Sequence, residues 1–178
     1  KPKAPKPPVI AIHTRESRDT AKIIKTFYVK YPQFRWIAFK DMRNLSRKKF
    51  AEALQETCVS VWMDDISGFG TFPLESMMVG NPVIGKLPNL KPDWLNEHNG
   101  IWTYETNKIV DIIGAYIKNW LEDEVPADLY EHTNNTVSEY RKFDVERILC
   151  DYIENLNQEK LGMLQQAENK LLETEPQN

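Results

Sequence analysis

A segment at residues 64–85, DDISGFGTFPLESMMVGNPVIG, joins a glycine-rich turn to the start of a helical pattern. Gly68 and Gly70 leave few side chains in the turn, so a ligand can approach the backbone N–H groups closely. Pro73, near the first position of the helix, is well tolerated because the N–H that it lacks would have no partner there. Free N–H groups and the positive end of the helix dipole favour an anion, most naturally a phosphate. The segment therefore predicts a phosphate site.

Glu75 lies about one turn into the same helix. A carboxylate in this position can accept two hydrogen bonds from a sugar diol, such as that of a ribose. A phosphate site beside a diol-binding acid has the composition of a nucleotide site. A purely structural interpretation rests on the same residues: the two glycines then only shape a tight strand-to-helix turn, and Glu75 only caps the helix.

Five apolar runs with the composition of β-strands alternate with helical patterns along the chain, and the glycine-rich segment follows the third of them. They are VIAIHT (9–14), RWIAFK (35–40), CVSVWM (58–63), PVIGKL (82–87) and GIWTY (100–104). This alternation predicts an α/β fold, a Rossmann-like doubly wound parallel sheet of about five to six strands with helices towards the C-terminus. We expect right-handed crossovers and the strand order 3-2-1-4-5, with the first strand central.

Ligands of such sheets bind outside the carboxyl ends of the strands, which places the turns at 13–19, 41–46 and 64–72 on the functional edge. The first turn contains Arg15 and Arg18. Each arginine either supplies positive charge to a departing diphosphate or is a solvated residue at a helix start. His13 is either a ligand contact or a structural residue.

Composition excludes several classes of function. The 178 residues carry a net charge of −3, which gives no electrostatic reason to expect nucleic acid or an anionic membrane as a partner. Cys58 and Cys150 lie far apart, so a reducing cytoplasm is the expected location. The three histidines lack ligand spacing, and Asp64 and Asp65 are typical of a capped, solvated strand end, so we expect no metal.

The chain divides into three parts by pattern. Residues 1–8, KPKAPKPP, are expected to be a Pro/Lys-rich linker, and the chain a piece of something longer. Residues 9–155 are predicted to form the nucleotide-binding domain. Residues 156–178 are polar and are predicted to be a helical or frayed tail.

The run SGFGTFPLESMMVGNPVIG resembles the signature of retaining nucleotide-sugar glycosyltransferases of the two-Rossmann (GT-B) type, the group 1 transferases. Their signature reads Glu-Gly-Phe-Gly, an apolar stretch, Glu-Ala-Met-Ala, a small turn and Gly-x-Pro-Val-Ile. This chain has Gly68-Phe69-Gly70, the run 74–78 and the run 80–84 in the same register. The resemblance covers roughly residues 9–155, the C-terminal, donor-binding half of such enzymes.

The resemblance implies roles for individual residues. Glu75 matches the glutamate that holds the nucleotide ribose. The donor diphosphate and hexose would be held along the turn, by Ser67, Gly68, Phe69, Gly70, Thr71 and Phe72. Two departures stand out: Ser67 replaces the signature's first glutamate, and HTRESRDT, with Arg15 and Arg18, lacks the usual Lys-Gly pair.

The activity implied by the resemblance is transfer of a sugar from a nucleoside diphosphate donor to an acceptor hydroxyl, with retention of configuration, in carbohydrate biosynthesis. No metal cofactor is expected, since helix ends and basic side chains neutralise the diphosphate. The acceptor, and any peripheral membrane association, would involve the missing N-terminal Rossmann domain, without which this chain is expected to be inactive. Two alternatives remain open: a degenerate, non-catalytic scaffold of the same design, and a nucleotide-sugar epimerase.

Overall fold

The computed structural model describes residues 8–14, 17–64, 69–140, 153–154, 158 and 160–163. Compact packing divides the chain into two units, Lys1–Val137 and Ser138–Asn178. This division falls before the predicted boundary at residue 155, which stays a prediction because residues 141–150 lie outside the described residues. The predicted linker, apart from Pro8, also lies outside them.

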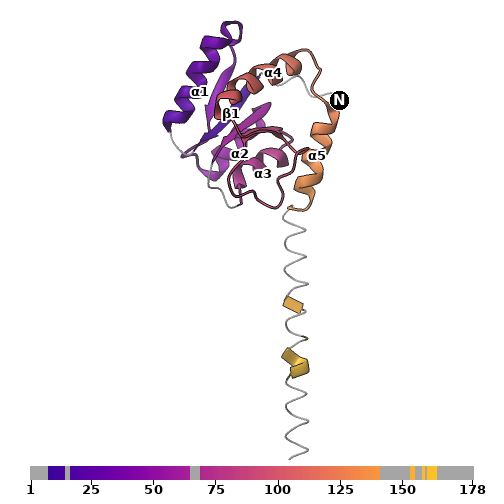
Figure 1. Ribbon diagram of the computed structural model, residues 1–178. Helices are drawn as coiled ribbons and strands as arrows, with labels where there is room; N and C mark the ends of the chain where they lie inside the picture. The colour runs from indigo at the N-terminus through magenta and orange to yellow at the C-terminus, as the bar shows by residue number, and fades with distance from the viewer. Residues whose placement is uncertain are drawn as a thin grey trace, which may run out of the picture. The chain divides into compact units, whose positions relative to one another are not determined.

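The first unit contains a parallel five-stranded sheet with helices packed against it (Figure 1). Its strands are β1 (Val9–Thr14), β2 (Ala38–Asp41), β3 (Val59–Met63), β4 (Val83–Lys86) and β5 (Ile101–Thr103). The α-helices are α1 (Ser17–Lys30), α2 (Arg47–Gln55), α3 (Thr71–Met78), α4 (Ile109–Leu121) and α5 (Ala127–Ser138). Short 3-10 helices are η1 (Pro32–Phe34) and η2 (Thr106–Lys108). The predicted α/β class is therefore confirmed.

The strand order is β2-β1-β3-β4-β5, so the predicted order 3-2-1-4-5 is wrong. β1 lies between β2 and β3, with Ile10 opposite both Phe39 and Val59. Both orders obey the right-handed crossover rule and differ in the face of the sheet that α2 covers, a choice that strand and helix patterns do not encode. The direction of winding reverses between β1 and β3, and this switch point is where ligands of such sheets bind.

The second strand also starts later than the predicted 35–40. Arg35 and Trp36 lie in a turn after η1, and Ile37 is buried before the strand begins at Ala38. The hydroxyl of Tyr28 in α1 donates to the carbonyl of Ile37 over 2.5 Å. This bond attaches the turn to α1, and β2 itself comprises four residues.

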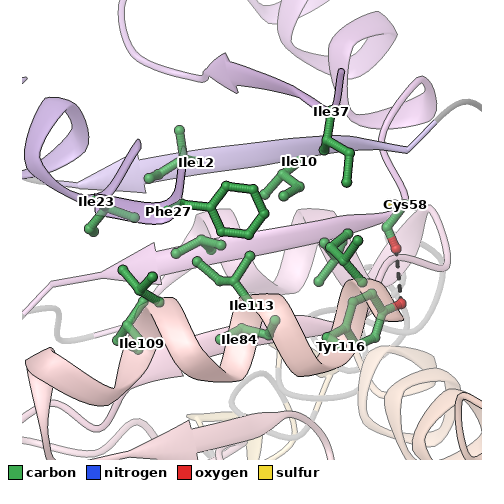
Figure 2. Packing of buried hydrophobic residues seen from close by; sticks show 14 of the residues in the cluster. Ile10, Ile12, Ile23, Phe27, Ile37, Cys58, Ile84, Ile109, Ile113 and Tyr116 are labelled. Atoms are coloured by element: carbon green, nitrogen blue, oxygen red, sulfur yellow. Dashed lines mark hydrogen bonds between the residues drawn. The ribbon is translucent and has the colours of Figure 1, made fainter. Parts of the chain in front are cut away.

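One face of the sheet is covered by α1 and α4, which also contact each other. Figure 2 shows Ile10 and Ile12 of β1 packed with Phe27 of α1 and Ile113 of α4. Tyr31, the residue after α1, packs closely on α4 at Gly114, where a Cβ atom would lie 2.3 Å from its Cζ. Removal of this apolar surface from water is the main stabilising term for this layer.

The helix α2 begins after a serine cap. Ser46 is the N-cap, and its Oγ accepts a hydrogen bond from the Lys49 N–H. Ala53 and Leu54 are buried. Phe50, about one turn earlier in the same helix, is half-buried, and its ring meets that of Phe72 edge-on at 6.1 Å between centroids. This contact joins α2 to the first turn of α3.

Candidate functional site

The carboxyl ends of β1 and β3 form the crevice at the switch point. His13 pairs with Trp62 and Thr14 with Met63, so the last residues of the two strands lie side by side. Thr14 is buried, and its hydroxyl hydrogen-bonds to that of Thr20 over 2.6 Å. This bond fixes the start of α1 beside the end of β1. Two helices therefore begin at this crevice, α1 after β1 and α3 after β3.

The glycine turn enters α3 through a backbone conformation that favours glycine. Gly70 is the N-cap, with φ of 70° and ψ of 62°, in the left-handed region. A Cβ atom there would lie 3.0 Å from Cζ2 of Trp94. The helix begins at Thr71, which makes Pro73 its third residue, slightly later than predicted. Pro73 still lies within the first four residues, whose N–H groups have no partner inside a helix.

An indole holds this turn in place. Nε1 of Trp94, in the loop after β4, donates to the carbonyl oxygen of Phe69 over 2.6 Å. The Phe69 side chain itself is 53% exposed, so burial of its ring does little to fix the turn. Trp94 was missed by reasoning from sequence, and its only signal was an aromatic residue in a polar, proline-containing loop.

His13 lies against the first turn of α3. Its ring is stacked on that of Phe72, with centroids 5.1 Å apart and planes inclined by 29°. Its Nδ1 atom is buried and has no hydrogen-bond partner among the described residues. An unpaired buried polar atom costs free energy, which is commonly tolerated where a ligand or an ordered water completes the site.

The charged groups around His13 act against each other. Burial lowers the pKa of His13 from 6.5, while the carboxylates of Asp64 and Asp41 raise it and Arg43 lowers it further. Burial is the largest of these effects, so the imidazole is neutral at pH 7 and can both donate and accept a hydrogen bond.

Glu75 is the fifth residue of α3 and is exposed. Nearby groups still remove enough water to raise the pKa of its carboxyl, an effect that the positive charge of Arg47 partly offsets. None of the described residues donates a hydrogen bond to this carboxylate. Glu75 therefore offers, close to the helix start, a carboxylate acceptor that the described part of the chain does not use.

Asp41, the last residue of β2, and Arg43, in the turn that follows, form an ion pair. Arg43 donates from Nε to Oδ1 of Asp41 over 2.9 Å and from Nη2 to Oδ2, and this bidentate contact lowers the pKa of Asp41. The Arg43 N–H also donates to Oδ1 over 3.1 Å. Arg43 is thus committed to its neighbour, and the pair shapes the turn next to His13.

The remaining predicted residues divide into two groups. Arg18 is exposed in the first turn of α1, the helix that follows β1, and its predicted role stays a prediction. Arg15, Ser67 and Gly68 lie outside the described residues, so their predicted roles stay predictions. The structure brings together Gly70, Thr71, Phe72 and Glu75 on one helix start, which is the geometry on which those roles depend.

Within the described ranges, no group of three or more histidine, cysteine, aspartate or glutamate residues has the geometry to hold a metal ion. Within the same ranges, no helix is long and apolar enough to cross a bilayer.

Comparison with known proteins gives a match in fold but not in sequence. No family model and no curated protein sequence matches the chain. The crystal structure of TarM matches with a TM-score of 0.60 at 13% identity, over 86% of this chain and 36% of TarM. The C-terminal domain of LpcC, a glycosyl transferase group 1 family protein from Francisella tularensis, matches with 0.56 at 15% identity, over 79% of this chain and 88% of that one.

The pneumococcal O-GlcNAc transferase GtfA, solved in complex with UDP and GlcNAc, matches with a TM-score of 0.57 at 14% identity. The match covers 86% of this chain and 36% of GtfA. The chain therefore spans little more than a third of TarM and of GtfA, and almost the whole of the separate LpcC domain. Its Rossmann-like α/β fold is the fold of a domain of these GT-B glycosyltransferases.

Proposed function

We propose that this chain is the donor-binding half of a retaining glycosyltransferase and binds a nucleoside diphosphate sugar at the crevice between β1 and β3. The observation that carries the proposal is the start of α3, where the left-handed Gly70 opens a helix that also presents the carboxylate of Glu75, to which none of the described residues donates a hydrogen bond. The N–H groups at this start suit a diphosphate, and Glu75 suits the ribose diol.

The solved relatives support this proposal. GtfA was crystallised with UDP and GlcNAc, and the LpcC structure is a C-terminal domain on its own. By analogy, the missing partner of this chain is an N-terminal Rossmann domain that brings the acceptor.

The chemistry that this half contributes is stabilisation of the leaving group. As the bond between the sugar and the diphosphate breaks, negative charge grows on the diphosphate oxygens. Backbone N–H groups at Thr71 and Phe72 and the helix dipole stabilise that charge without reorganisation, and Arg15 or Arg18 adds a full positive charge. His13, neutral and stacked on Phe72, adds a further ring nitrogen at the same edge.

The decisive experiment is calorimetric titration of UDP, GDP and ADP into the chain and into two variants. Glu75→Gln keeps the shape but removes the charged acceptor, and we expect it to weaken nucleotide binding by about 1.5–3 kcal/mol, as for a hydrogen bond to a charged group. Glu122→Gln, an equally conservative change at the exposed end of α4, serves as the control and is expected to bind normally. Equal affinity in Glu75→Gln, or no binding of any nucleoside diphosphate by the parent chain, would reject the proposal.

A further inference from the structure

A cavity of about 410 Å³ lies at the carboxyl edge of the sheet beyond the glycine turn. Leu87 and Tyr104, which directly follow β4 and β5, line it together with Trp102 of β5. Its volume falls in the range of roughly 300–1,000 Å³ typical of sites for small molecules. Because the strands are parallel, the cavity opens at the same edge as the start of α3. None of its lining residues has a part in the proposed nucleotide site.

Two indoles connect the cavity to the glycine turn. Trp94 donates to the carbonyl of Phe69 in that turn, and its ring lies 6.3 Å from the ring of Trp102, measured between centroids. Trp102 lines the cavity. The cavity and the glycine turn are therefore joined by a continuous chain of contacts through Trp94 and Trp102.

The lining of the cavity has the chemistry that binds a sugar ring. Tyr104 is 68% exposed, although the ammonium of Lys91 lies 5.7 Å from the centre of its ring. An aromatic face of this kind stacks against the apolar C–H face of a pyranose. Buried Nε1 of Trp102 has no acceptor among the described residues, which marks this wall as incompletely satisfied.

Polar groups of both kinds surround these rings. Oδ1 of Asn96 already accepts hydrogen bonds from the N–H groups of His98 and Asn99, over 2.9 and 3.0 Å. The amide NH₂ of Asn96 can therefore donate to a ligand. Glu97 supplies an acceptor and Lys91 another donor. A hydroxyl group both donates and accepts, so a ring bearing several hydroxyls can pair with the donors and with the acceptor in this lining. A phosphate would instead be repelled by the negative charge of Glu97.

We infer that this cavity binds a hexopyranose ring of the acceptor, as a second carbohydrate subsite beside the donor. The inference rests on the proposed function, since the donor sugar at the glycine turn is what makes the neighbouring sugar an acceptor. It assigns acceptor recognition partly to this half of the enzyme.

Saturation-transfer NMR with methyl glycosides of glucose, galactose, mannose and N-acetylglucosamine tests the subsite. We expect at least one glycoside to bind at millimolar concentration and glycerol, the control polyol, not to bind. Tyr104→Ala is expected to weaken that binding about tenfold. Trp36→Ala, which removes an aromatic ring of 59% exposure in the turn after η1, is expected to leave it unchanged. The inference is overturned if none of the four glycosides binds, or if the two variants behave alike.

Titration of UDP into the same variants separates this inference from the proposed function. We expect Tyr104→Ala to bind UDP normally while losing the glycoside, and Glu75→Gln to lose UDP while keeping the glycoside. If Tyr104→Ala loses UDP instead, the cavity holds the nucleotide and the subsite assignment is wrong. If UDP binds nowhere but the glycoside response depends on Tyr104, the proposed donor function fails while the sugar site stands.

Discussion

The indole N–H of Trp94 donates to the carbonyl oxygen of Phe69 over 2.6 Å, and so ties the loop after β4 to the glycine turn before α3. A turn that binds a diphosphate through its N–H groups should be ordered before the ligand binds. If the turn became ordered only on binding, the entropy lost by its backbone would reduce the affinity. Trp94 also packs on Trp62, which lies on β3 and is buried. Through Trp94, the turn is therefore attached to the buried centre of the sheet.

Replacement of Trp94 by phenylalanine should loosen the turn. The ring remains but the donor is lost, which leaves the carbonyl of Phe69 without this bond and lowers the free energy of unfolding by about 1 kcal/mol. We expect a loss of UDP affinity in addition, measured by calorimetry alongside urea unfolding. Trp36→Phe is the matched control. An unchanged affinity in Trp94→Phe would show that the turn is fixed by other contacts.

Gly70→Ala should be markedly destabilising, both because of the positive φ and because of a steric clash with Trp94. Comparison with Gly80→Ala separates these two causes. Both glycines have positive φ, 70° and 79°, which costs a residue with a Cβ about 1–2 kcal/mol. Nothing lies within 4 Å of a Cβ at Gly80, whereas one at Gly70 meets Trp94 at 3.0 Å. We therefore expect a larger loss in unfolding free energy for Gly70→Ala, measured by urea denaturation. Equal losses would mean that Trp94 moves aside without cost.

His13 should make the fold sensitive to mild acid. Burial lowers the pKa of the folded imidazole from 6.5, so the unfolded chain binds this proton more readily than the folded chain. The unfolding free energy should accordingly fall as the pH drops below about 6.5, down to the lower pKa of the folded state. His13→Gln removes the titratable imidazole. It should therefore flatten the plot of unfolding free energy against pH between about pH 5 and 7.5, which unfolding experiments measure. A profile of unchanged slope would show that His13 titrates normally.

Ser67 should decide how much the sugar adds to donor binding. A serine is shorter than the glutamate of the resembled signature, and it is neutral, so it holds hexose hydroxyls more weakly. We expect a nucleoside diphosphate to bind about as tightly as the matching nucleotide sugar, within about tenfold. Ser67→Glu should favour the sugar-bearing ligand selectively, which titration of both ligands measures. A parent chain that already prefers one nucleotide sugar by several hundredfold would contradict this expectation.

The local features of the fold could be read from the sequence because they depend on neighbouring residues. Ser46 caps α2, a position where serine is strongly preferred, and the strand 9–14 has the predicted bounds. The strand order could not be read, because it depends on which face of the sheet α2 buries, and both faces are apolar.

The candidate site was predicted only in part for the same reason. Gly70 and Glu75 belong to one contiguous motif, which a sequence displays directly. Trp94 reaches the turn from 25 positions away, and His13 on β1 stacks on Phe72 in α3. These contacts form only when the sheet brings separate segments together, so the spacing of residues along the sequence does not predict them.

The central place of β3 also has a consequence for how the chain folds. Ile10 of β1 pairs with Val59 of β3, 49 positions later, whereas Val61 pairs with Ile84 of β4 after only 23. Longer loops cost more entropy to close and slow the formation of the contacts that they join. During synthesis, β1 can therefore pair with β3 only after about fifty further residues have been added. The crevice that serves as the candidate site is built by the slower of these two pairings.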